Sequence, residues 1–344
     1  MKRNHNTKIL WLFLSLVCFL YILYLILYRK PSSNQIELFT NKDIQYSNWW
    51  SSDPQKYTNL FQYMFENSSY PHIKIYSVFP TVTMDKKKSE GADTLVVQFS
   101  GESIYGNPDN FDINFIPTDN LQPDASTTFS ASSRSASELC SYTERSNVIV
   151  FPYALFHMLM MKMDMQLFLV PRTLPNTRPE QFCLFSVSNG AAVERKEFFL
   201  ELSKYKKVDS CGKFMNNMDM GCPNDHESSE YYDFIAKYKF MICFENTSLP
   251  NYLTEKIVNA YSSGTIPIYW GCPNLGDYVN MDSILYLPPK YTIEDRNQLI
   301  QKIIYLDTNP DAYRAMYEQS FFKNGKLPDE FNIEKIKEKI SKIK

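Results

Sequence analysis

Two basic residues near predicted helix starts could bind a phosphate-bearing ligand. Lys256 lies in the early turns of a helix predicted over residues 253–262, and Arg195 lies in the first turns of the preceding helix. Fixed cations and helix N-termini are the groups with which proteins commonly bind phosphates. Because each helix follows a predicted strand, both cations could face one diphosphate at the edge of a sheet.

Polar residues also gather where the predicted strands end. They follow three apolar runs: Ser188-Asn189 after 182–187, Glu245-Asn246 after 240–244, and Gly271 after 265–270. Ligands of open parallel sheets bind outside the carboxyl ends of the strands. The chain has no GxGxxG and no P-loop sequence, which argues against dinucleotide enzymes and P-loop NTPases.

The elements that must position these residues alternate between strand and helix, which predicts an α/β fold with parallel sheets. Further strands are predicted at 73–79, 95–99, 148–151 and 284–287. One helix places Phe198, Leu202 and Tyr205 on a single face. Gly264 is expected to end the helix 253–262, and a weak capping box at Thr292 is expected to start another.

The segment 244–256 reads FENTSLPNYLTEK, and IPIYWG follows at 266–271. This spacing closely resembles the donor-binding signature of the α1,3-fucosyltransferases, which is Phe-Glu-Asn-Ser/Thr, a short spacer and Tyr-aliphatic-Thr-Glu-Lys. The segments 183–195 and 99–112 resemble other parts of the family. The resemblance covers about residues 95 to 317 and is weak across 118–180.

The resemblance implies a GT-B fold, in which two Rossmann-like domains face a cleft. It also implies a glycosyltransferase that moves L-fucose from GDP-β-L-fucose to a GlcNAc hydroxyl of a glycan, with inversion and in α1,3-linkage. Two acceptors stay open, a LacNAc-type antenna and the core of an N-glycan. The segment 208–213 loosely resembles family members that fucosylate the core.

The same resemblance gives roles to single residues. Glu102 is the candidate base that takes the proton of the acceptor hydroxyl, with Asp109 and Asp112 as competitors. The residues expected to bind the donor are Arg195 and Lys256 at the diphosphate, Glu255 at the ribose, and Asn246, Tyr252, Ser188 and Asn189 around them. The two cations would stabilise the charge that develops on the departing GDP.

We expect no metal site and no required cofactor. No Asp-x-Asp occurs in the chain, whereas one-domain nucleotide-sugar transferases use that pair to hold a divalent ion. The absence is consistent with the two-domain GT-B architecture, in which protein cations replace the ion. A divalent cation could still stimulate activity.

The N-terminus predicts one transmembrane helix. Residues 9–28 are apolar or aromatic apart from Ser15, and basic residues flank them on both sides. Twenty residues span about 30 Å as a helix, enough to cross a bilayer core. We interpret the segment as a retained signal-anchor, with a cleaved signal peptide as the alternative. The excess of basic residues before it favours a type II protein of the Golgi membrane whose catalytic part faces the lumen.

Cysteines and glycosylation sequons fit that location. Six cysteines follow the predicted span, and an even number permits three disulfides. Cys211 and Cys222 bracket a short loop and are the expected pair, while buried free thiols are the alternative for the others. Asn67 and Asn246 each begin a sequon, and we expect Asn67 to be glycosylated because Asn246 lies in the functional segment.

These observations divide the chain into a cytoplasmic tail (1–8), the signal-anchor (9–28), a stem (29–70), an acceptor-side domain (71–175), a GDP-fucose-binding domain (176–328) and a C-terminal helix (329–344). A net charge of −2 argues against nucleic-acid partners. Three alternatives stay open: an inactive glycan-binding protein of the same fold, a GT-B transferase with another nucleotide sugar, and a structural membrane protein.

Overall fold

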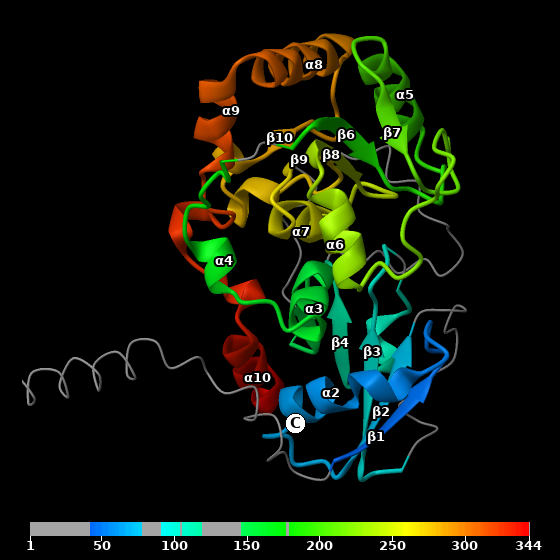
Figure 1. Ribbon diagram of the computed structural model, residues 1–344. Helices are drawn as coiled ribbons and strands as arrows, with labels where there is room; N and C mark the ends of the chain where they lie inside the picture. Colours follow the sequence, from blue (N-terminus) through cyan, green and yellow to red (C-terminus); the bar gives the residue numbers. More distant parts are fainter. Residues whose placement is uncertain (1–41, 78–90, 104, 119–145, 177–178, 344) are drawn as a thin grey trace, which may run out of the picture. The chain divides into compact units, whose positions relative to one another are not determined.

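A computed structural model describes residues 42–343, apart from 78–90, 104, 119–145 and 177–178 (Figure 1). The predicted signal-anchor at 9–28 lies outside the described residues. Within the described part of the chain, no helix is both long enough and apolar enough to cross a membrane.

The first half of the chain forms a five-stranded sheet whose strands are all parallel and follow one another in chain order. Its strands are β1 (Asp43–Ser47), β2 (His72–Ser77), β3 (Thr94–Phe99), β4 (Ile113–Ile116) and β5 (Val148–Val150). Strand β3 is buried along almost its whole length and ends three residues before Glu102. The central position of β3 therefore fixes where that carboxylate emerges.

The assignment of residues 29–70 to a stem is wrong for the part from Asp43 onward. Strand β1 pairs with β2, and the helix α2 (Thr58–Met64) buries Phe61 and Met64 in the core. The sequence hides β1 because it is an edge strand: only Ile44 is fully buried and its neighbours are polar. The first domain therefore begins by Asp43 and not at residue 71.

The second half forms another five-stranded parallel sheet, in the order β10-β9-β8-β6-β7. Its strands are β6 (Gln181–Phe185), β7 (Val208–Ser210), β8 (Tyr238–Phe244), β9 (Ile266–Trp270) and β10 (Leu285–Tyr286). The other helices are α3 (Tyr153–Met160), α4 (Gln166–Leu169), α5 (Val193–Ser203), α6 (Ser229–Ile235), α7 (Glu255–Ser262), α8 (Ile293–Thr308), α9 (Pro310–Tyr317) and α10 (Ile333–Lys342). The predicted α/β fold with parallel sheets is confirmed.

Local signals set the ends of the helices near the site. Thr254 is extended and precedes α7, so that helix begins at Glu255 and not at residue 253. Gly264 follows α7 with φ +77°, the left-handed conformation expected of a helix-ending glycine. Thr292 and Asp295 form the predicted capping box of α8. Tyr205, predicted on the face of α5, lies beyond the end of that helix.

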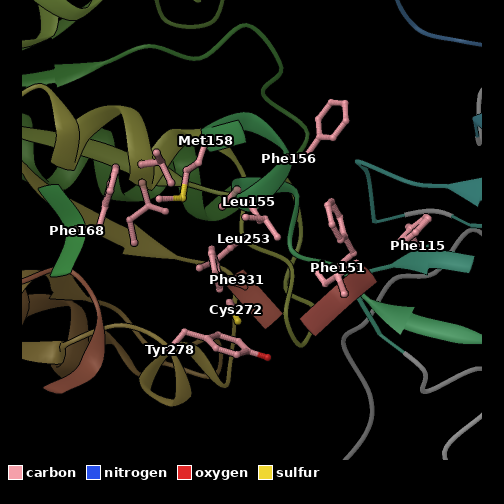
Figure 2. Close-up of a cluster of buried hydrophobic side chains, with 14 of the residues drawn as sticks. Phe115, Phe151, Leu155, Phe156, Met158, Phe168, Leu253, Cys272, Tyr278 and Phe331 are labelled. Atoms are coloured by element: carbon pink, nitrogen blue, oxygen red, sulfur yellow. The ribbon is translucent and has the colours of Figure 1, made fainter. Parts of the chain in front are cut away.

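One apolar cluster joins the two halves of the chain. It includes Phe115 of β4, Leu155 and Met158 of α3, and Leu253 and Cys272 from the second half (Figure 2). The last helix, α10, returns to α2 of the first half, where Lys337 contacts Glu66 and lies over the ring of Tyr63 (Figure 1). A second apolar cluster fills the space between the second sheet and α5, α8 and α9.

Candidate active site

A cavity of about 420 Å³ opens where the second sheet ends and Glu102 of the first half approaches it. Seven of the eight residues predicted for catalysis or donor binding line it: Glu102, Ser188, Asn189, Arg195, Asn246, Glu255 and Lys256. The eighth, Tyr252, is buried and donates a hydrogen bond to Glu102. The structure therefore brings together residues that are up to 154 positions apart, from 102 to 256.

The Glu102 carboxylate contacts the predicted donor-binding segment. Its Oε2 accepts hydrogen bonds from Nδ2 of Asn246 at 3.1 Å and from the Tyr252 hydroxyl at 3.2 Å. No described residue donates to its Oε1. Asp112 instead binds the backbone of Val96, and Asp109 is exposed and does not line the cavity. Of the three carboxylates considered from the sequence, only Glu102 is placed in the site.

Asn246 has an unused acceptor inside the cavity wall. Its Nδ2 donates to Glu102, but its Oδ1 is buried and has no hydrogen-bond partner among the described residues. A buried acceptor without a partner costs free energy, so such an atom in a cavity wall points to a donor on a bound molecule.

Glu245, which the sequence places in a polar cluster and in the motif 244–256 without a role of its own, fixes the start of α7. Its side chain is fully buried and accepts hydrogen bonds from the backbone N–H of Thr254 at 2.9 Å and from the Thr254 hydroxyl at 2.7 Å. The Tyr269 hydroxyl also donates to Oε1 of Glu245, the oxygen that accepts the Thr254 N–H, at 3.3 Å. Burial raises the pKa of Glu245, and the nearby Lys256 ammonium opposes that rise.

The Lys256 ammonium has three acceptors around it in the free protein. Its Nζ lies 2.9 Å from Thr254 Oγ1, 2.9 Å from Glu255 Oε1 and 3.5 Å from Glu245 Oε2. Burial lowers the pKa of Lys256, but the two carboxylates outweigh it and raise that pKa above its usual value. Burial likewise opposes the ionisation of Glu255, yet Lys256 dominates and lowers the Glu255 pKa to about 2. Lys256 and Glu255 are therefore both charged at neutral pH.

Arg195 is buried and connects two strand ends. Its Nε and Nη2 donate to the carbonyl of Phe244 at 3.1 and 2.8 Å, and its Nη1 donates to the carbonyl of Asn189 at 2.8 Å. Phe244 is the last residue of β8, and Asn189 lies in the turn after β6. A guanidinium carries five N–H groups, so Arg195 can hold these two segments and still offer two donors to a ligand.

Several wall residues were not found from the sequence. His157 of α3 contacts Oδ1 of Asn259 at 2.8 Å and the Tyr232 hydroxyl at 3.1 Å, and burial lowers its pKa so that the ring is neutral at pH 7. The remaining unpredicted residues are Tyr153, Ser186, Val187, His226, Glu227, Tyr231, Met241 and Asn259. Tyr153 and His157 of α3 and Tyr231 of α6 meet the site only through tertiary packing, which no short motif encodes.

Outside the cavity, the structure places other residues that the sequence singled out. Cys211 and Cys222 form the predicted disulfide, and Cys183, Cys243 and Cys272 are buried free thiols. Asn67 of the first sequon is exposed. No group of three or more His, Cys, Asp and Glu residues that could hold a metal ion occurs in the part of the chain that the structure describes. A second cavity of about 420 Å³ lies by the amino ends of β6 and β8 and contains no predicted site residue.

Two parallel α/β sheets with a polar cavity at the ends of strands place the site where open α/β folds bind their ligands. Residues 176–328 match the family model described as glycosyltransferase family 10 (fucosyltransferase) C-term. This segment is therefore similar to the C-terminal domain of glycosyltransferase family 10. The match, over less than half of the chain, supports the family that the sequence motif predicted.

Individual relatives agree with this assignment. The chain is 32% identical over 167 residues to a putative fucosyltransferase of Acanthamoeba polyphaga mimivirus, covering 47% of this chain and 26% of the relative. It is 36% identical over 135 residues to an α-(1,3)-fucosyltransferase of Helicobacter pylori, covering 39% of this chain and 26% of the relative. It is 30% identical over 129 residues to human GDP-fucose protein O-fucosyltransferase 3, covering 36% and 26%. The chain thus spans about a quarter of the length of these relatives.

The solved structures extend the likeness of fold to most of the chain. A crystal structure of an α1,3-fucosyltransferase covers 88% of this chain and 89% of its own, with a TM-score of 0.63 and 21% identity. A crystal structure of α1,3-fucosyltransferase with GDP covers 91% and 92%, with a TM-score of 0.60 and 22% identity. These structures confirm the two-sheet architecture that was predicted as GT-B.

Proposed function

We propose that the protein transfers L-fucose from GDP-β-L-fucose to a hydroxyl group of a GlcNAc residue, with inversion and in α1,3-linkage. The observation that carries the proposal is the contact between Glu102 and the segment 246–252, because it joins a candidate base to the family's donor-binding motif. The H. pylori relative, named as an α-(1,3)-fucosyltransferase, supports the linkage.

In this mechanism Glu102 is the general base. Its Oε2 is held by Asn246 and Tyr252, so Oε1 is the atom that takes the proton from the acceptor hydroxyl as the new glycosidic bond forms. The attack comes from the face opposite the departing GDP, which inverts the β-linked donor to an α-linked product. Lys256, together with the two remaining N–H groups of Arg195, stabilises the negative charge that develops on the β-phosphate.

The donor would be bound by groups at the carboxyl end of the second sheet. Glu255 is expected to accept hydrogen bonds from the ribose hydroxyls, and Ser188 and Asn189 to line the same side of the cavity. Charged protein groups are then sufficient for the chemistry, and we propose that no metal or cofactor is required, although a divalent cation could stimulate turnover.

For the acceptor we propose a glycan, either a LacNAc-type antenna or the core of an N-glycan. Protein O-fucosylation is a second candidate, favoured by relatives from several vertebrates that are named GDP-fucose protein O-fucosyltransferase 3. The chain spans 28% or less of those proteins, so their acceptor is only a candidate here.

We also propose that residues 9–28 hold the protein in the Golgi membrane as a type II protein with its catalytic part in the lumen. The apolar character of that segment and the disulfide between Cys211 and Cys222 support this location, because disulfides persist in oxidising compartments.

The test is release of GDP by purified protein that lacks residues 1–40, with EDTA present. Several nucleotide sugars are offered in parallel, each with a LacNAc acceptor, an N-glycan or a folded protein domain. Release from GDP-fucose alone, with one acceptor class alone, would support the proposal and name the acceptor. Release of the nucleotide from another nucleotide sugar would instead indicate a GT-B transferase with a different donor. Tight GDP binding without release would favour the inactive glycan-binding protein, and absence of GDP binding would refute the proposal.

A further inference from the structure

Tyr153 lines the cavity, and its hydroxyl group is left without a hydrogen bond in the described part of the chain. Tyr153 is the first residue of α3 and lines the cavity together with Glu102 and Lys256. Its hydroxyl makes no hydrogen bond to any residue that the structure describes. By contrast Tyr231, which lines the same cavity, donates its hydroxyl proton to Oγ of Ser186 at 2.9 Å.

The ring of Tyr153 is held firmly, although its hydroxyl is free. It packs over Gly101 so closely that a Cβ added there would lie 2.6 Å from Cδ2 of Tyr153, so only glycine leaves room for it. The ring also packs against two other aromatic rings. The distances between ring centroids are 5.7 Å to Phe156 and 6.3 Å to Trp50. A rigid aromatic side chain with a polar end is well suited to contact a ligand.

Tyr153 lies where the two halves of the site meet. Gly101 precedes Glu102 directly, so the ring contacts the segment that carries the candidate base. The next residue after Tyr153, Ala154, donates its backbone N–H to the carbonyl of Leu253 at 2.8 Å, which lies two residues before Glu255. The Tyr153 side chain is thus positioned both by the segment that carries Glu102 and by the donor-binding segment at 244–256.

The surroundings keep the hydroxyl protonated. Burial, followed by the negative charge of Glu255, raises the pKa of Tyr153 well above its ordinary value. The hydroxyl can therefore donate a hydrogen bond at any physiological pH. Nearby, Oδ1 of Asn246 is a buried acceptor without a partner in the described part of the protein. These two atoms add an unused donor and an unused acceptor to the cavity wall, as recognition of a sugar hydroxyl requires.

We infer that Tyr153 contacts the transferred sugar of the nucleotide-sugar donor through its phenolic hydroxyl. The inference rests on the proposed function, because the order of groups in the donor places the sugar between the diphosphate near Lys256 and the acceptor oxygen near Glu102. A side chain that contacts the Glu102 segment and faces the same cavity then meets the sugar and not the guanine.

The test compares binding of GDP and of GDP-fucose to the full-length protein in detergent, by calorimetry. Tyr153→Phe removes one oxygen that no described residue contacts, so the variant is expected to fold normally. It should bind GDP within about twofold of the wild-type protein and GDP-fucose about tenfold more weakly, the loss of one hydrogen bond to a sugar hydroxyl. Tyr231→Phe is the matched control, since its hydroxyl is already satisfied by Ser186.

The outcomes separate the inference from the proposed function. A selective loss of GDP-fucose affinity in Tyr153→Phe, absent from Tyr231→Phe, supports the contact. Unchanged binding of both ligands, equal weakening of both, or the same selective loss in both variants overturns it. If the wild-type protein itself fails to bind GDP, the proposed function falls and the inference falls with it.

Discussion

At the scale of single residues, the site separates the candidate base from the groups that would bind GDP. Glu102 contributes no contact to Lys256 or Glu255, and its two hydrogen bonds come from Asn246 and Tyr252. A carboxylate placed in this way can be neutralised without disturbing the diphosphate site. Proton transfer by Glu102 and binding of GDP by Lys256 should therefore respond differently to substitution.

Glu102→Gln should lose transfer but keep nucleotide binding. An amide of nearly the same shape can still accept hydrogen bonds from Asn246 and Tyr252, but it cannot take up the acceptor's proton. We expect turnover to fall on the order of 100- to 10,000-fold, the usual contribution of a general base. GDP affinity should stay within about twofold, as checked by calorimetry. Near-normal turnover would remove Glu102 from the mechanism.

Lys256→Ala should have the opposite pattern, with loss of GDP binding itself. The substitution removes the one ammonium group in the cavity and leaves the Glu245 and Glu255 carboxylates without their shared partner. Repulsion between these carboxylates and a diphosphate would then add to the loss of the cation. GDP binding should become undetectable by calorimetry at micromolar protein. Wild-type affinity in this variant would exclude Lys256 from the donor site.

Glu255 competes with any phosphate for Lys256. The ammonium has three N–H donors, and three acceptors already surround it, so a diphosphate must displace one of them. Glu245 is fully buried, whereas the side chain of Glu255 is 32% exposed and can move away. Glu255→Gln should therefore bind inorganic pyrophosphate, which has no ribose, about three- to tenfold more tightly than the wild type.

Glu102→Gln is the matched control for that measurement. It removes a negative charge from the same cavity without freeing Lys256, so its pyrophosphate affinity should change little. Equal tightening in both variants would mean that general electrostatics of the cavity, and not release of Lys256, governs anion binding.

At the scale of elements, the turn that holds Glu245 depends on Gly271. This glycine follows β9 with φ +144°, and a Cβ there would lie 2.6 Å from Cγ of Glu245. Gly271→Ala should lower the free energy of unfolding by about 1–3 kcal/mol and also weaken GDP binding, because Glu245 must move and it supports the start of α7.

Gly276→Ala provides the comparison for Gly271→Ala. A Cβ at Gly276 would meet Met281 at no less than 3.6 Å, an ordinary contact, and the backbone there is not left-handed. Thermal unfolding and GDP titration of both variants test the difference. If Gly271→Ala were as stable as Gly276→Ala and bound GDP with the same affinity, this account of the turn would be contradicted.

The sequence predicted the second sheet better than the first for physical reasons. Strands β6, β8 and β9 are buried on both faces, so they read as continuous apolar runs that end at polar turns. Strand β1 is an edge strand with one fully buried residue, and its polar residues resemble those of a linker. For the same reason the first domain was predicted to begin too late.

The residues of the candidate site likewise fall into those that the sequence could identify and those that it could not. Residues inside one contiguous motif, such as Asn246, Glu255 and Lys256, could be found by their spacing. His157 and Tyr153 lie on α3, and their role depends on packing against residues about 100 positions later, as in the bond from His157 to Asn259. No local pattern encodes that contact. Glu245 was visible as a polar residue, but only its burial shows that it organises the start of α7.

At the scale of the whole molecule, one continuous apolar cluster extends from the first sheet through α3 into the second half. A ligand that binds at the second sheet should therefore stabilise both halves together. Tryptophan fluorescence can report on the first half, since Trp49 and Trp50 pack against Phe99 of β3, while Trp270 belongs to β9.

Trp270→Phe removes the reporter of the second half, and the buried indole N–H it deletes has no hydrogen-bond partner among the described residues. This variant is made in the protein that lacks residues 1–40, so that Trp11 is absent as well. Its fluorescence midpoint on heating should coincide with the loss of helical circular dichroism, and saturating GDP should raise both midpoints equally. Coincident transitions are the expected sign of one cooperative unit. A fluorescence midpoint that GDP leaves unchanged, while the dichroism midpoint rises, would show that the two halves unfold independently despite the shared cluster.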